Sequence, residues 1–150
     1  MTAAIENKAT ATSGQLATFR LDGDLYGVEV EHVQEVLRSQ QLTRVPLAPS
    51  AVAGLINLRG QVVTAIELRE RLGRPPRPEG TDAVVIVVRL HGEAVSLLVD
   101  SIADVVDVDA EDFESPPDTL EGQARELIRG AYKLEGSLLL ALDVHKAVGA

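Results

Sequence analysis

A chain of 150 residues, 45% of them hydrophobic and 25% charged, has the size and balance of one small soluble domain, or of two very small ones that share a core. The absence of Cys excludes disulfides, thiolate metal sites and Cys nucleophiles, and the formal charge of −9 opposes binding to nucleic acids or anionic membranes. The N-terminus has no signal-peptide pattern and the apolar runs are too short to span a bilayer, so we expect a cytoplasmic protein.

The chain predicts a short tail followed by many strands. Residues 1–14 are rich in Ala, Thr, Ser and Asn and show no apolar period, which predicts a disordered N-terminal tail. After that, short apolar runs alternate with turn signals every 8 to 12 residues or so, as in β-sandwiches and β-barrels. Short helices are predicted over Glu67–Leu72 and Asp143–Val148, and one turn over Asp109–Phe113. The predicted strands are Gln15–Leu21, Leu25–Val30, Val36–Val45, Gly54–Leu58, Gln61–Leu68, Ala83–Leu90, Glu93–Val99, Ala103–Val108, Glu126–Leu134 and Ser137–Leu142.

Four of the predicted strand pairs are joined by turns that end in Gly. Gly adopts the positive φ of a tight hairpin at little cost, so each of these pairs is predicted to be a β-hairpin. The Pro-rich stretch at residues 74–78 cannot be a central strand and is predicted to be a connector. The four turns are Asp22-Gly23, Arg59-Gly60, His91-Gly92 and Glu135-Gly136.

The sequence contains an internal repeat, in which Gly54–Gly73 aligns with Gly130–Gly149. A chance alignment of Gly and Leu is the simplest alternative, but a second similarity occurs in the same order within each half. Each half then contains a hairpin, an apolar-acidic turn and a second hairpin. About five strands are too few for a sandwich but enough for a small barrel, so two similar barrels with a binding groove between them are predicted. The second similarity aligns Val30, Val33, Glu35 and Val36 with Val99, Ile102, Asp104 and Val105.

One hairpin resembles a known family. The stretch from Val52 to Gly60, VAGLINLRG, with its continuation to Gly73, is similar to the signature hairpin of the CheW chemotaxis proteins. Matching segments extend the resemblance from about Leu16 to Val148, with departures at Thr64 and Glu67, where the family commonly has proline and aspartate. The resemblance implies an all-β fold (mainly β with a few short helices). Over residues 15–150 we expect two intertwined, five-stranded, SH3-like β-barrels.

The resemblance also implies a function. Members of this family are non-enzymatic adaptors that couple the cytoplasmic signalling tips of chemoreceptors to the regulatory domain of the histidine kinase CheA. They are expected to be monomers alone and to form rings with the kinase in arrays at the inner face of the membrane. An adaptor of another chemosensory pathway, serving pilus motility or a second-messenger output, is the nearest alternative. An oligonucleotide-binding barrel is a distant one, because the chain has only two Phe, two Tyr and a strong negative charge.

The candidate binding residues each have a simpler structural interpretation. The simpler interpretation of Arg59 is a solvated turn residue, but the resemblance implies signalling contacts, and its planar guanidinium suits a carboxylate. Glu35 would otherwise be the exposed side of an edge strand, with Asp104 as its counterpart in the repeat. The apolar candidates are either core residues or the lining of a groove for a receptor helix. The expected receptor-binding set is Val33, Glu35, Val36, Arg59, Val99, Ile102 and Val105, and the expected kinase-binding set is Gly54, Leu58 and Gly60, whose glycines are structural first.

No catalytic, cofactor or metal site is predicted. The three histidines, His32, His91 and His145, show no metal-ligand spacing, and no phosphate-binding glycine loop or nucleophile elbow is present. The acidic run at residues 100–112 lacks the turn Gly of an EF-hand, and its alternation of Asp with Val indicates one face in water.

Overall fold

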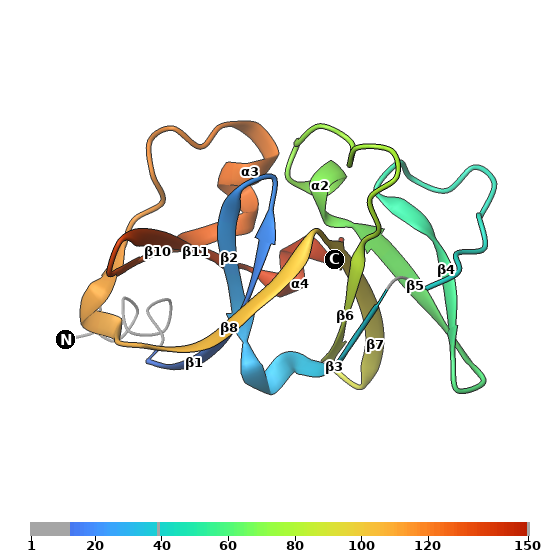
Figure 1. The fold of residues 1–150 in the computed structure, drawn as a ribbon, viewed down its shortest axis with the longest axis horizontal. Helices are drawn as coiled ribbons and strands as arrows, with labels where there is room; N and C mark the ends of the chain where they lie inside the picture. The colour runs from blue at the N-terminus through green and yellow to red at the C-terminus, as the bar shows by residue number, and fades with distance from the viewer. Residues whose placement is uncertain (1–12, 39, 150) are drawn as a thin grey trace.

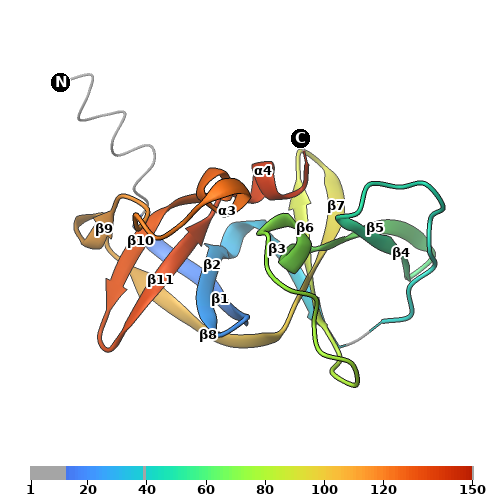
Figure 2. The same cartoon turned by 90° about the horizontal axis from the view of Figure 1, so that it is seen from above.

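The computed structural model describes residues 13–38 and 40–149 and consists of two curled β-sheets that lie side by side (Figures 1 and 2). Most of the predicted tail lies outside the described residues, and Gly14 already belongs to the first strand. The first barrel contains β1 (Gly14–Leu21), β2 (Asp24–Glu29), β8 (Ser101–Val108), β9 (Phe113–Glu114), β10 (Ile128–Leu134) and β11 (Ser137–Leu142). The second contains β3 (Val33–Leu37), β4 (Val52–Leu58), β5 (Gln61–Glu67), β6 (Val84–Leu90) and β7 (Glu93–Val99).

The helices are few and short, as the sequence predicts. The α-helices are α2 (Leu68–Arg71), α3 (Gly122–Leu127) and α4 (Val144–Ala147), with 3-10 turns η1 (Val30–His32) and η2 (Ala110–Asp112). Glu67 and Asp143 are the N-caps of α2 and α4, and each side chain accepts a hydrogen bond from a backbone N–H of its helix. No helix in the described part of the chain is long and apolar enough to cross a membrane.

The two halves of the chain exchange hairpins. The β1–β2 hairpin comes from the first half but pairs with β8 and β11 of the second half. The β6–β7 hairpin comes from the second half but pairs with β3 and β5 of the first. The barrels are therefore intertwined, as expected, and neither is built from one half of the chain alone.

The strand registers confirm the internal repeat. The sheet orders β8-β1-β2-β11-β10 and β3-β6-β7-β5-β4 correspond strand by strand, and β9 is added to the first. In each barrel one parallel pair joins the exchanged hairpin to the rest: Gly27 faces Ala141 in the first, and Ser96 faces Ala65 in the second. Gly27 is equivalent to Ser96 in the repeat, and Ala141 to Ala65, so the two barrels have the same strand register.

Two strand predictions are wrong. Of the predicted strand Val36–Val45, Val36 and Leu37 belong to β3, which starts earlier, at Val33, and ends where a polar run begins. Further on, among the described residues, Thr43 forms an isolated bridge to Leu55. The predicted strand Glu126–Leu134 starts at Ile128, and the residues before it belong to α3. Ala124 and Leu127 are buried three residues apart on that helix, a spacing that puts both on one helical face.

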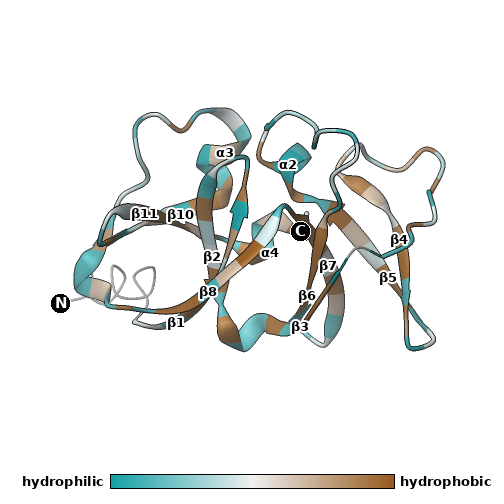
Figure 3. Cartoon of the chain, in the orientation of Figure 1, coloured by the Kyte–Doolittle hydropathy of each residue, from teal (hydrophilic) through white to brown (hydrophobic). Residues whose placement is uncertain are grey.

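The hydrophobic core joins the two barrels. One cluster combines Phe19 and Tyr26 of the first barrel with Leu68, Ile86 and Leu97 from the second. Two smaller clusters fill the barrels separately. Figure 3 shows the hydrophobic residues concentrated along β5, β6 and β7, which lie next to this shared core. Because the central cluster belongs to both barrels, we expect them to unfold together.

The Pro-rich connector is held by a buried arginine. Arg69 of α2 is 6% exposed and donates two hydrogen bonds to the carboxylate of Asp100, at 2.9 and 2.6 Å. It also donates to the carbonyl oxygen of Pro75, at 2.9 Å. Arg77 pairs with both Asp100 and Glu67. The connector between α2 and β6 is therefore fixed to the body by ion pairs and hydrogen bonds.

Candidate functional site

Arg59 stands at the tip of the β4–β5 hairpin. Arg59 and Gly60 have φ of 51° and 85°, the positive values that both central residues of a tight two-residue hairpin turn require. Asn57 supports this turn, since its side-chain oxygen accepts a hydrogen bond from the Gly60 N–H at 3.0 Å. The Arg59 side chain is 79% exposed. The turn therefore presents the guanidinium group to solvent.

The guanidinium of Arg59 forms a two-point ion pair with Glu35. Its Nη1 and Nη2 atoms lie 2.8 and 3.1 Å from the two carboxylate oxygens. Glu35 lies in β3, an edge strand of the second barrel. The sequence indicated both residues separately, and the structure brings them together from elements 24 residues apart. An exposed pair of this kind contributes only about 0–1 kcal/mol to folding, so stability alone does not explain its geometry.

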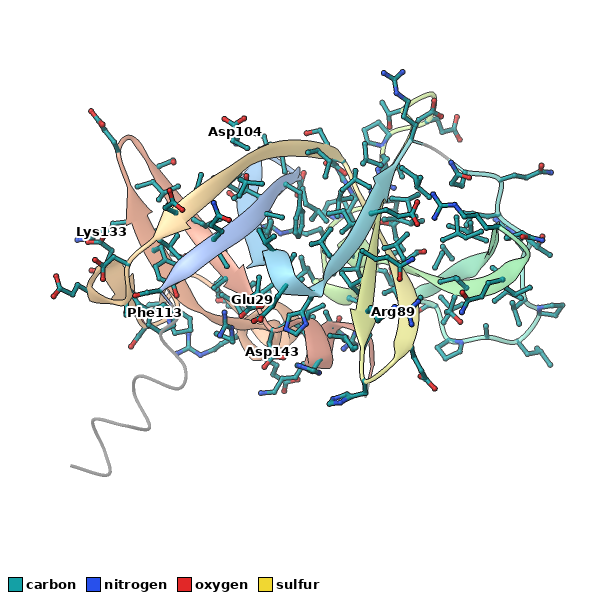
Figure 4. The ribbon with its side chains drawn as sticks, turned by 90° about the horizontal axis from the view of Figure 1, so that it is seen from below. Glu29, Arg89, Asp104, Phe113, Lys133 and Asp143 are labelled. Atoms are coloured by element: carbon teal, nitrogen blue, oxygen red, sulfur yellow. The ribbon has the colours of Figure 1, made fainter. Side chains whose placement is uncertain are left out.

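The first barrel has no equivalent ion pair. In the repeat, Asp104 of β8 matches Glu35 and Glu135 matches Arg59, so the corresponding place has two acids. Figure 4 shows Asp104 projecting from β8 away from the barrel, and the residue is exposed. Its backbone oxygen accepts a hydrogen bond from the Thr18 hydroxyl. The two barrels share a fold but present different charges at this surface.

The apolar candidates divide between surface and core. Val36, Ile102 and Val105 are 45%, 42% and 56% exposed, so the core interpretation is wrong for them. Val99 is fully buried, so it lies beneath the surface and cannot touch a partner directly. Val33 is half-buried against the central cluster. The surface part of the candidate set lies on the edge strands β3 and β8, which occupy equivalent places in the two barrels.

The kinase-binding candidates lie on the β4–β5 hairpin. Gly60 is exposed at its tip, and Leu58 is half-buried. Gly54 is buried, and the backbone that approaches it belongs to this chain: a Cβ at position 54 would lie 2.6 Å from the carbonyl oxygen of Thr43. The expected close approach at Gly54 is therefore made inside the protein.

We expect Gly54→Ala to destabilise the fold by about 1–3 kcal/mol, because the new methyl group must push the Thr43 backbone away from β4 and because the φ of 156° is unfavourable for alanine. Gly60→Ala is the matched control, since it adds the same methyl group where nothing lies within 4 Å and costs only the strain of a positive φ, about 1 kcal/mol. Urea unfolding of both variants measures the difference. Equal losses would show that the Thr43 contact is unimportant.

Sequence reasoning missed two clusters. The buried ion pair of Arg69 was not predicted, because an arginine on a short surface helix is normally solvated. The available sign of a buried partner was Asp100, an acid directly after the apolar run Leu97–Val99.

The three histidines, which are far apart in the sequence, lie together in the fold. The ring of His145 is 5.6 Å from that of His32 and 5.2 Å from that of His91. Within residues 13–38 and 40–149, no group of three or more His, Asp or Glu is arranged to hold a metal ion.

A hollow of about 440 Å³ lies between the barrels, away from the candidate residues. Leu72 and Arg74, which follow α2, line it next to the second barrel. Leu120, Ala124 and Leu140, which lie in or near α3 and β11, line it next to the first barrel. No candidate receptor-binding residue lines it. The candidate surface is therefore a set of exposed strand edges and a hairpin tip, which suits a protein partner better than a small ligand.

Comparison with known proteins points to one family. The family model described as "CheW-like domain" matches residues 15–150. The chain is 33% identical over 136 residues to "Chemotaxis protein CheW" of Treponema pallidum, covering 88% of this chain and 80% of that protein. It is 30% identical over 134 residues to the Bacillus subtilis protein of the same name, covering 89% and 86%. "Protein PilI" of Pseudomonas aeruginosa is 26% identical over 117 residues, covering 78% and 66%.

A solved structure has the same fold. The crystal structure of "scaffolding protein TtCheW" from Thermoanaerobacter tengcongensis superposes with a TM-score of 0.81 at 27% identity. The match covers 93% of this chain and 94% of that one. The two intertwined barrels are thus shared with a protein that is described as a scaffold.

Proposed function

Because the chain belongs to the family of CheW-like domains, we propose that it is a non-enzymatic adaptor that couples chemoreceptor signalling tips to the histidine kinase CheA. The adaptor works in the cytoplasm, beside receptor arrays at the inner face of the membrane. It is a monomer alone and forms rings with the kinase. Its relatives are named as chemotaxis proteins and its structural neighbour as a scaffold, and these names support the proposal.

The observation that carries the proposal is the ion pair between Arg59 and Glu35. It holds an exposed guanidinium over β3, the strand that also carries the exposed Val36. A partner carboxylate can compete for the arginine, and a partner apolar side chain can cover the valine. This combination of one arginine and a nearby apolar surface is the usual make-up of a protein-binding hot spot.

The remaining surface candidates extend the receptor-facing surface to the other barrel. Ile102 and Val105 lie on β8, where Val105 occupies the place that Val36 has on β3. A helical receptor tip with an apolar stripe can bury such residues in the helix-in-groove manner. Val99 supports β8 from within the core. The kinase contact is assigned to the β4–β5 hairpin, through Leu58 and Gly60.

A related pathway is the second candidate. The similarity to PilI, at 26% identity, keeps open an adaptor role in a chemosensory pathway other than chemotaxis, such as pilus motility or a second-messenger output. The two roles use the same surfaces and differ in which receptors and which kinase bind. Co-purification from the source cell identifies the partners and so separates the two.

We expect Arg59→Ala to weaken binding to a receptor signalling fragment by about tenfold or more, the range of an arginine hot spot. The free energy of unfolding should change by less than about 1 kcal/mol, because the Arg59 side chain is 79% exposed. Titration of the fragment, with thermal unfolding of the same samples, measures both quantities.

Arg125→Ala is the control for this experiment. Arg125 is an exposed arginine on α3, beside the first barrel, and among the described residues its guanidinium donates a hydrogen bond to the Pro117 carbonyl oxygen, at 3.5 Å. Its replacement removes one positive charge of the same kind and should leave binding unchanged. If Arg59→Ala binds the fragment as tightly as Arg125→Ala does, Arg59 does not belong to the receptor-binding surface.

A further inference from the structure

The ion pair between Arg59 and Glu35 is connected to a second arginine. Arg89, near the end of β6, donates from its Nε to the side-chain oxygen of Gln34, at 2.8 Å. Its Nη1 donates to the carbonyl oxygen of Gly92, in the turn of the same hairpin, at 2.7 Å. Figure 4 shows Arg89 on this hairpin, next to β3. Although Arg89 is an exposed residue, its side chain is therefore held at two points.

A β-bulge brings Gln34 next to Glu35. Val33 of β3 faces Val88 of β6. The next facing pair is Glu35 with Val87, so Gln34 is an extra residue on β3. Successive side chains of a regular strand point to opposite faces, and a bulge interrupts this alternation. The amide nitrogen of Gln34 lies 3.4 Å from a carboxylate oxygen of Glu35, so the two neighbouring side chains meet on one side of the strand.

The two arginines are linked through Gln34 and Glu35. The Oε2 atom of Glu35 accepts from Gln34 and, at 2.8 Å, from Nη1 of Arg59. Its Oε1 atom accepts from Nη2 of Arg59 at 3.1 Å. Because a guanidinium carries more donors than Glu35 accepts, an edge that includes Nε remains for a partner carboxylate. The position of the Glu35 carboxylate therefore sets the direction of the edge that a partner meets.

The first barrel has the same bulge without this polar link. β1 and β8 shift register at the equivalent place. The repeat puts Arg20 in the place of Arg89, and Ala103 in the place of Gln34. An alanine side chain has no polar atom that could link the arginine to Asp104. The bulge and the arginine thus occur in both barrels, whereas the link through Gln34 is added in the second barrel, which also has the ion pair.

We propose that Gln34 and Arg89 are positioning residues, which hold Arg59 in the orientation that a chemoreceptor signalling tip binds. The inference rests on the proposed function, in which Arg59 contacts the receptor. Arg89 fixes the side chain of Gln34, and Gln34 restrains the carboxylate of Glu35. That carboxylate directs the guanidinium of Arg59. An arginine at an exposed hairpin tip otherwise samples many rotamers, and ordering such a side chain during binding weakens the affinity.

Arg89→Ala should weaken the binding of a receptor signalling fragment, measured by titration, by about three- to tenfold, the cost of ordering one long side chain. The unfolding transition should hardly change, because Arg89 is exposed. Arg20→Ala is the matched control, since it removes the same charge at the equivalent position of the first barrel and should leave the affinity almost unchanged. Equal losses of affinity in the two variants would show that only the positive charge matters, and would overturn the proposal.

A double-mutant cycle separates positioning from direct contact. If Arg89 acts through the carboxylate of Glu35, Arg89→Ala should cause no further loss of affinity in a Glu35→Ala background. A loss of the same size in both backgrounds would mean that Arg89 touches the receptor itself or acts through the fold. Either of these explanations would replace the positioning role.

The guanidinium of Arg59 provides a readout that needs no partner. A two-point ion pair restricts the rotation of a guanidinium, and this rotation exchanges the ¹⁵N signals of Nη1 and Nη2. We expect faster exchange between the two signals of Arg59 in Arg89→Ala and in Gln34→Ala than in the wild type or in Arg20→Ala. Unchanged exchange in the first two variants would contradict the proposed link.

The binding experiment also distinguishes this inference from the proposed function. If the wild type fails to bind the receptor fragment, the proposed function is wrong and the positioning role falls with it. If the wild type binds and Arg59→Ala loses affinity, but Arg89→Ala binds like the wild type, only the positioning role is wrong.

Discussion

Residues 1–79 and residues 80–150, produced separately, are expected to remain unfolded, whereas an equimolar mixture of the two fragments is expected to give the native fold. The break falls in an exposed turn of the connector, at Gly80, and leaves every strand intact. In the first fragment β2 lacks its parallel partner β11, and in the second β7 lacks its partner β5. Each fragment therefore exposes unpaired strand edges and half of the shared core.

The measurement is a ¹H–¹⁵N correlation spectrum of each labelled fragment, alone and after addition of the other. Dispersed amide signals should appear only in the mixture, together with the far-ultraviolet circular dichroism of the intact protein. The intact chain at the same concentration is the control. A fragment that gave a dispersed spectrum by itself would show that one half of the chain can close its own barrel. That result would contradict the conclusion that each barrel needs strands from both halves.

This exchange could not be predicted from the sequence, although the repeat could. The alignment of Gly54 with Gly130 identifies equivalent positions, and both glycines face an alanine in the same register, Ala65 and Ala141. Hairpins form between neighbouring segments, so their Gly turns are visible locally. The parallel pairings of β2 with β11 and of β5 with β7 join segments far apart, and only the packing of the whole chain selects them.

The candidate site was predictable in its parts and not in its assembly. The resemblance pointed to Arg59 and Glu35, but nothing in their spacing indicates that they touch. Similar apolar residues also differ in burial: Val99 ends the fully paired strand β7, whereas Val105 lies on the edge strand β8. The alternation of Asp with Val after Asp100 does indicate an exposed face, and β8 has one. Of the three valines of β8 only Val105 is exposed, whereas Val106 and Val108 pack in the core of the first barrel.

Arg69→Met is expected to destabilise the protein by about 3 kcal/mol, the lower end of the range for breaking a buried ion pair. Methionine fills similar space but donates no hydrogen bond, so Asp100 loses two donors and the Pro75 carbonyl loses one. Arg77 still pairs with Asp100, at 3.1 Å, which limits the loss. Arg125→Met makes the same chemical change at an exposed position and should cost less than about 0.5 kcal/mol.

The pH dependence of stability distinguishes the lost ion pair from a simple packing defect. Burial raises the pKa of Asp100, but hydrogen bonds from Arg69 and from the Asp22 N–H, with the charges of Arg69 and Arg77, outweigh it and lower the pKa from 3.8 to about 2. A carboxyl whose pKa falls on folding stabilises the fold above its unfolded pKa, and this contribution, about 2 kcal/mol, is lost as the pH decreases from about 5 to 2. In Arg69→Met the pKa of Asp100 returns toward its ordinary value, so urea unfolding between pH 5 and 2 should show a shallower decline than in the wild type. Parallel declines in the two proteins would mean that Arg69 acts through packing and not through its charge.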